Sequence, residues 1–128
     1  MFNGKRIKVS QTEDLINSLL ATGFAYQREE TSQDNRQNFN RLNMLAHGVR
    51  RFGSAAIDLC YVACGRFDGF WELYLAPWDV AAGGLIVTEA KGCVTEINGG
   101  SNYIYGHNIV ASNKKTHSLI CENLDAFT

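Results

Sequence analysis

The sequence predicts an α/β fold, because segments with helical spacing alternate along the chain with short apolar segments typical of strands. The chain has 128 residues, of which 45% are hydrophobic, and both values suit one globular domain. Twelve Lys and Arg against thirteen Asp and Glu give a net charge of −1, so a nucleic-acid surface is not expected. No apolar stretch is long enough for a membrane span.

The first part of the chain predicts two strands and one helix. Residues 7–9 alternate apolar and charged side chains, as a short strand does, and the apolar segment that ends at Thr22 and Gly23 predicts a buried strand. Residues 27–34 are polar and are expected to form a loop. From residue 35 to about 47, apolar side chains recur at helical spacing.

The central part predicts a strand, a helix and a second strand. A short strand is expected over residues 49–52, and Ser54 is a good N-cap for a helix over residues 55–64. Gly65 suits the position after that helix, where a positive φ is common. The aromatic-rich segment 67–75 predicts the next strand.

The last part continues the alternation. Pro77 begins a predicted helix that ends near Ala90. Two strands are expected over residues 93–97 and 109–112, and Asn113 is expected to cap a final helix.

The four cysteines indicate reduced, mostly buried thiols rather than a metal site. Cys60, Cys64, Cys93 and Cys121 form no Cys-x-x-Cys pair, and no His lies beside them at the spacing of zinc ligands. The start of the chain also lacks the apolar segment of a signal peptide. We therefore expect a cytoplasmic protein.

Asp79 is the most informative candidate for chemistry, because it stands in the first turn of a predicted helix and is followed by small residues. It has two interpretations. The carboxylate can simply be favoured by the helix dipole, or it can bind a metal ion at the mouth of a site that small neighbours keep open.

Two further candidates have a structural and a functional interpretation each. Glu72 lies in an aromatic strand, where it either faces solvent or accepts hydrogen bonds from a polyol near a bound cation. Gly53, Ser54 and Ala55 begin a helix, where they either cap it or offer backbone N–H groups to an anion or a hydroxyl group.

The chain closely resembles the inositol monophosphatase family. The most specific combination is the Gly-Ser-Ala-Ala turn that begins at Gly53 with the Trp-Asp-Val-Ala-Ala-Gly element that begins at Trp78. Other similar segments spread the resemblance over nearly the whole chain: residues 2–5, 18–23, 61–72, 85–90 and 111–113.

The resemblance implies the layered α/β sandwich of the sugar phosphatases, a class that includes fructose-1,6-bisphosphatase. It also implies Mg²⁺-dependent, lithium-sensitive hydrolysis of inositol monophosphates and related sugar phosphates. Asp79 matches the family's metal-binding Asp at the substrate site, and Glu72 matches the Glu that binds inositol hydroxyls. Gly53, Ser54 and Ala55 match the substrate-binding turn.

The chain departs from the family where most metal ligands belong. The family's Glu-Glu element and its Asp-Pro-x-Asp-Gly-Thr loop do not occur in this sequence, and the pair Glu29-Glu30 lies downstream of where that element belongs. We expect residues 1–14 to be a remnant of the N-terminal α+β region and residues 15–128 to be the C-terminal α/β domain.

We therefore expect this chain alone to be inactive as a phosphatase. Its expected partners are an inositol monophosphate or related sugar phosphate, and either further copies of itself or a complementary N-terminal chain. The alternative is a non-catalytic module that binds a phosphorylated polyol or a protein.

Overall fold

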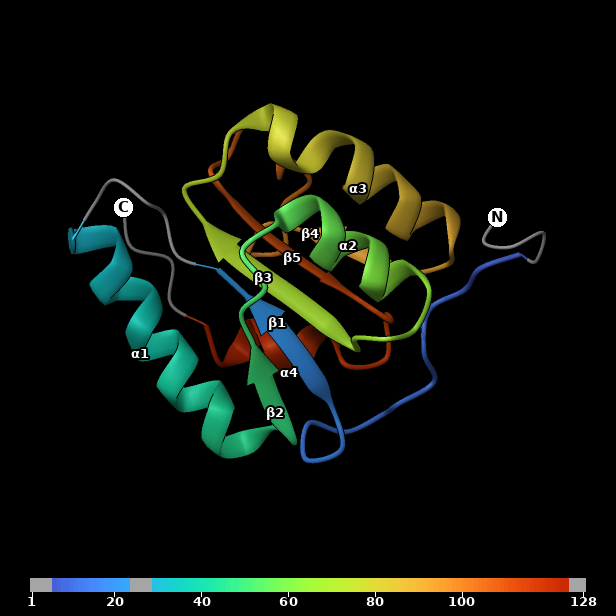
Figure 1. Ribbon diagram of the computed structural model, residues 1–128, viewed down its shortest axis with the longest axis horizontal. Helices are drawn as coiled ribbons and strands as arrows, with labels where there is room; N and C mark the ends of the chain where they lie inside the picture. Colours follow the sequence, from blue (N-terminus) through green and yellow to red (C-terminus); the bar gives the residue numbers. More distant parts are fainter. Residues whose placement is uncertain (1–5, 24–28, 125–128) are drawn as a thin grey trace.

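A computed structural model describes residues 6–23 and 29–124 of the chain (Figure 1). The elements in chain order are β1 (Leu19–Thr22), α1 (Glu29–Leu45), β2 (Gly48–Arg50), α2 (Ala55–Ala63), β3 (Gly69–Leu73), α3 (Pro77–Glu89), β4 (Cys93–Thr95), β5 (Asn108–Ser112) and α4 (His117–Glu122). The α/β class predicted from the sequence is confirmed.

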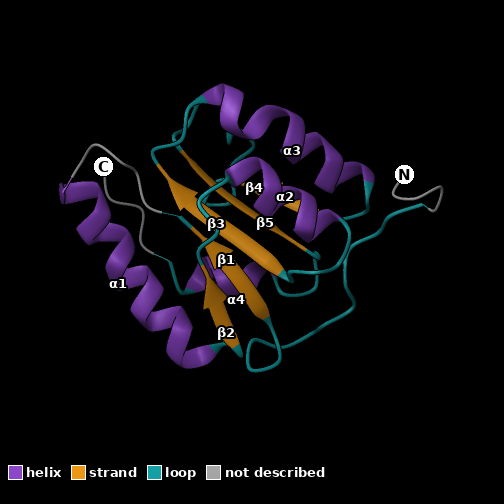
Figure 2. Ribbon diagram, viewed as in Figure 1, coloured by secondary structure: helices purple, strands orange, loops and turns teal. Residues whose placement is uncertain are grey.

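The strands form one mixed sheet in the order β2-β1-β3-β5-β4. Strand β1 pairs in parallel with both β2 and β3, whereas β5 runs antiparallel to its neighbours β3 and β4. Figure 2 shows the strands in orange with helices on both sides of the sheet, so the molecule has three layers.

The period of two along the strands divides the core between the two faces of the sheet. In β3, Phe70 packs with the α2 and α3 residues Leu59 and Val80, whereas Trp71 packs on the other face with Leu42 of α1 and Ile120 of α4. Helices α2 and α3 therefore cover one face, and α1 and α4 cover the other.

Two predictions for the first part of the chain are wrong: the strand over residues 7–9 and the loop over residues 27–34. Residues 6–10 form no strand, and Val9 is instead buried against α3 with its N–H donating to the carbonyl of Ala90 at 3.2 Å. Helix α1 begins at Glu29, within the segment 27–34 that was predicted as loop. Its buried face continues through Asn35 and Asn38, so apolar spacing marks only the second half of the helix.

The helix-capping predictions are largely confirmed. The Ser54 hydroxyl accepts from the N–H of Ile57 at 3.3 Å, and Gly65 takes a φ of 87° directly after α2. Lys91 takes a φ of 74° after α3, where glycine would be unstrained. The last helix begins later than expected, because Asn113 caps the preceding turn through Thr116.

The expectation that the cysteines are mostly buried is wrong. Cys60 is exposed and the other three, Cys64, Cys93 and Cys121, are half-buried; all four are free thiols. Over residues 6–23 and 29–124, no helix is both long and apolar enough to cross a bilayer.

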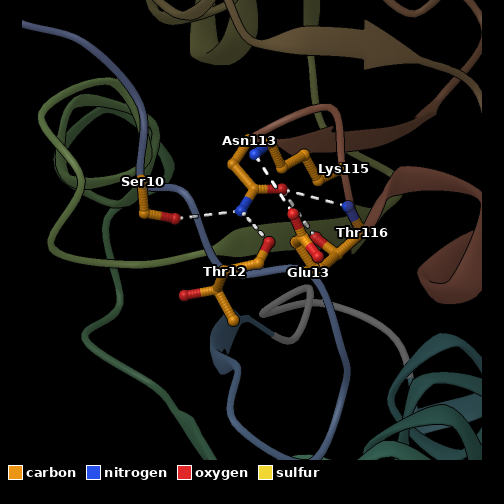
Figure 3. A network of polar contacts seen from close by, with 6 residues as sticks. All are labelled: Ser10, Thr12, Glu13, Asn113, Lys115 and Thr116. Carbon is orange, nitrogen blue, oxygen red and sulfur yellow. Dashed lines mark hydrogen bonds and ion pairs between the residues drawn. The ribbon is translucent and has the colours of Figure 1, made fainter.

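A buried polar network attaches the N-terminal segment to the sheet (Figure 3). The Asn113 side-chain amide donates to the Ser10 hydroxyl at 3.0 Å and to the Thr12 carbonyl at 2.7 Å, and its oxygen accepts from the Thr116 N–H at 3.1 Å. The Ser10 hydroxyl in turn donates to Asp68, which also accepts the Leu19 N–H at 2.7 Å. Segments about a hundred residues apart in sequence are thereby joined.

We expect Asn113→Ala to lower the free energy of unfolding by about 2–3 kcal/mol, because it leaves several buried polar groups without a partner. Lys115→Ala is the matched control, since Lys115 belongs to the same turn and its side chain forms an exposed ion pair with Glu13 at 3.4 Å. Its expected cost is below about 0.5 kcal/mol. Urea unfolding of both variants measures the difference, and equal costs would contradict the role given to Asn113.

Candidate functional site

The candidate residues gather at one end of the sheet. Strands β1, β2 and β3 are parallel, so their carboxyl ends share an edge, which is where ligands usually bind in open α/β sheets. Gly53 follows β2, and Glu72 lies near the end of β3. Figure 1 shows α2 and α3 side by side, both beginning at the end to which β3 points.

The turn Gly53-Ser54-Ala55 leads from β2 into α2. Gly53 has a φ of 81°, and Ser54 is the N-cap of the helix. Gly53 is exposed, and Ser54 and Ala55 are half-buried, so the turn is accessible. An exposed helix start of this kind can donate backbone N–H groups to an anion, as the second interpretation of the sequence requires.

Glu72 is buried, so its solvated interpretation is wrong. The side chain is 7% exposed and lies on the α2–α3 face of the sheet, because strand residues alternate and its neighbours Trp71 and Leu73 face the other side. Burial, and then the negative charges of Asp58 and Asp79, raise the pKa of Glu72 to about 8. A carboxyl group held this way binds a proton, a hydroxyl group or a cation favourably.

Asp79 lies in the first turn of α3 and is half-buried. Its Oδ2 accepts the N–H of Ala76 at 3.0 Å, so the carboxylate helps to begin the helix and also gains from the helix dipole. This contact supports the structural interpretation of Asp79 and leaves the other carboxylate oxygen for a ligand. Trp78, the neighbouring residue, is 83% exposed.

Asp58 is a member of this acidic group that sequence reasoning did not assign to the site. It is 1% exposed, and neither carboxylate oxygen has a hydrogen-bond partner in the part of the chain that the structure describes. Burial raises its pKa to about 6. The signal in the sequence was a single acid on an otherwise small and apolar helix.

The small residues after Asp79 allow α2 and α3 to pack closely. A Cβ placed on Gly83 would lie 2.8 Å from Cβ of Leu59 in α2. The close contact at Gly83 therefore fixes how α3 lies against α2.

The arrangement defines a class of protein: a three-layer α/β domain with an acidic group at the carboxyl edge of its parallel strands. The chain belongs to the inositol monophosphatase family, whose sequence profile matches residues 1–127. The resemblance noted in the sequence is thus confirmed, as is the family fold.

Three relatives illustrate the similarity. The chain is 48% identical to an inositol-1-monophosphatase of Synechocystis over 97% of its own length and 43% of the relative's. It is 43% identical to the Nus factor SuhB of Escherichia coli, covering 95% of this chain and 46% of that protein. A solved inositol monophosphatase from Anabaena superposes with a TM-score of 0.90 at 47% identity, covering 94% and 48%. The chain spans about half the length of these relatives.

Proposed function

We propose that this chain is one half of an Mg²⁺-dependent phosphatase that hydrolyses inositol monophosphates or related sugar phosphates, and that it does not turn over substrate alone. The observation that carries the proposal is the placement of Glu72, Asp79 and the turn at Gly53 around one edge of the sheet. These are the positions that the family resemblance assigns to the substrate and the metal.

Each part of the site has a distinct chemical task in this proposal. The backbone N–H groups at the start of α2 would hold an anionic or hydroxyl group of the substrate. Glu72 would accept hydrogen bonds from the polyol, and Asp79 would offer one carboxylate oxygen to the cation. Bound Mg²⁺ supplies positive charge for the phosphate and the leaving oxygen in such hydrolysis.

The residues described here do not form a metal site by themselves. Among the side chains that the structure describes, residues 6–23 and 35–124, no three His, Cys, Asp or Glu are arranged to hold a metal ion. The unpartnered carboxylate of Asp58 adds negative charge nearby but no complete ligand set. We therefore assign Mg²⁺ binding and lithium sensitivity to a site that is completed by further carboxylates.

The outer side of α2 and α3 supports the idea of a missing partner. Between Asp79 and Thr88, helix α3 carries only apolar and small residues, on its exposed side as well as on its buried side. Ile57, Trp78 and Leu85 are between 49% and 83% exposed. A groove of about 900 Å³ also lies beside this surface, between residues 6–8 and the C-terminal half of α3. We propose that a complementary N-terminal half, or failing that a second copy, covers this surface.

Phosphate release from inositol 1-phosphate with Mg²⁺ tests the proposal. We expect no release above the blank from this chain alone, and release when it is co-expressed with the N-terminal half of the Synechocystis relative. Asp79→Asn should then lower the activity more than about 100-fold, because a carboxylate ligand is lost. Robust turnover by the 128-residue chain alone would contradict the half-site.

A non-catalytic binding module is the second candidate, and one observation favours it. A relative 43% identical to this chain is named for a role as a Nus factor, which is not the name of a phosphatase. Binding of inositol 1-phosphate without Mg²⁺, unchanged in Asp79→Asn and measured by calorimetry, would favour this alternative over the half-enzyme.

A further inference from the structure

A second buried polar network joins α1 to the two strands beside the acidic site. Asn35 is 2% exposed, and its amide nitrogen donates to the carbonyl of Gly23 at 2.5 Å and to the hydroxyl of Thr22 at 3.2 Å. Its amide oxygen accepts the indole N–H of Trp71 at 2.6 Å. One side chain of α1 thus fixes both the end of β1 and the residue before Glu72.

The register of the two strands brings this network beside the site. Thr22 of β1 pairs with Trp71 of β3, and the Thr22 hydroxyl donates to the Trp71 carbonyl at 2.7 Å. Because β1 and β3 run in parallel, the next residues, Gly23 and Glu72, also lie side by side. Their side-chain positions face the α2–α3 layer, opposite to Trp71.

Gly23 leaves the space that the Glu72 carboxylate occupies. A Cβ placed on Gly23 would lie 2.8 Å from Cδ of Glu72, closer than such atoms approach in proteins. The backbone of Gly23 therefore forms one wall of the Glu72 side-chain site. Asn35 holds that wall in place, since it bonds the Gly23 carbonyl directly.

We propose that Gly23 and Asn35 are positioning residues for Glu72, holding its carboxylate against the backbone of Gly23 on the α2–α3 face of the sheet. Asn35 sets the distance between Gly23 and β3, and Gly23 admits the carboxylate without a side chain of its own. This inference rests on the proposed function, in which Glu72 binds the polyol of the substrate. It gives α1 a role in the site through the side-chain amide of Asn35.

The test compares Asn35→Ala with Asn38→Ala. Asn38 is 0% exposed and lies one turn further along the same helix, so its loss controls for removal of a buried amide. NMR of the chain measures the nuclear Overhauser effect between the Gly23 α-protons and the Glu72 side chain. It also measures the indole N–H resonance of Trp71. We expect Asn35→Ala to lose the Overhauser effect between Gly23 and Glu72 and to shift the Trp71 indole resonance upfield. Asn38→Ala should keep the Overhauser effect and leave the indole resonance in place.

Two further experiments distinguish a loss of positioning from a failure to fold and from a failure of the proposed function. Gly23→Ala should displace the carboxyl ¹³C resonance of Glu72 while the Trp71 indole resonance stays, and this holds even if Asn35→Ala fails to fold. In the two-half enzyme, Asn35→Ala should raise KM for inositol 1-phosphate about tenfold with a smaller change in kcat.

Each outcome of these experiments decides one point. An unchanged Overhauser effect in Asn35→Ala, or an unmoved Glu72 resonance in Gly23→Ala, overturns the positioning role. A two-half enzyme without activity overturns the proposed function instead, because the NMR results on the chain still stand.

Discussion

Replacing Glu72 by Gln should stabilise the chain strongly at alkaline pH. The folded state raises the pKa of Glu72 from 4.5 to about 8, so the folded carboxyl holds its proton more tightly than the unfolded one. Its contribution to stability is fully present below about pH 4.5 and is lost as pH rises through about 8. Above that pH, folding must bury a carboxylate beside two other acids.

The expected gain for Glu72→Gln is on the order of 3–5 kcal/mol at pH 9 and close to zero at pH 4. Urea unfolding at both pH values measures it. Glu89→Gln, an exposed carboxylate of α3, is the control and should change stability little at either pH. Equal stability of wild type and Glu72→Gln at pH 9 would contradict the burial of the ionised Glu72 side chain. The same substitution should weaken substrate binding, so the site is kept at a cost in stability.

Gly83→Val should be among the most destabilising single substitutions on the α2–α3 face. Gly83 is buried, and even a Cβ there would lie 2.8 Å from Cβ of Leu59. The two helices would have to separate, which opens the core around Leu59 and moves both helix starts away from Glu72. We expect the free energy of unfolding to fall by about 2–4 kcal/mol.

Ala82→Val is the matched control for Gly83→Val, because it adds a β-branched side chain one position earlier on the exposed side of α3. Its expected cost is about 0.5 kcal/mol, from helix propensity alone. Thermal or urea unfolding of the two variants separates close packing from propensity. If both cost the same, the close approach of α2 and α3 is not what requires glycine.

Apolar period and turn chemistry were enough to predict most of the fold. Ser54, Gly65 and Pro77 marked helix boundaries that the structure keeps, because each has a local role in capping or backbone conformation. The first half of α1 could not be predicted this way. Its buried face carries Asn35 and Asn38, whose burial depends on partners far away in the sequence.

The candidate site was predictable only in part, and for a related reason. Asp79 and the turn at Gly53 stand at helix starts, which a sequence pattern reveals. The burial of Glu72 depends on which face of β3 the helices cover, and Asp58 gains its importance from a neighbour in another element.

The position of β5 affects how the chain can fold during synthesis. Among residues 6–23 and 29–124, the strand that is synthesised last is β5, and it lies inside the sheet between β3 and β4. Until residue 112 has emerged, β4 has no strand to pair with, and β3 lacks one of its two neighbours. During synthesis, β3 and β4 therefore have unpaired strand edges, which are prone to pairing with other chains. A chain that ended shortly before β5 would lose not one edge strand but the connection between β4 and the rest of the sheet.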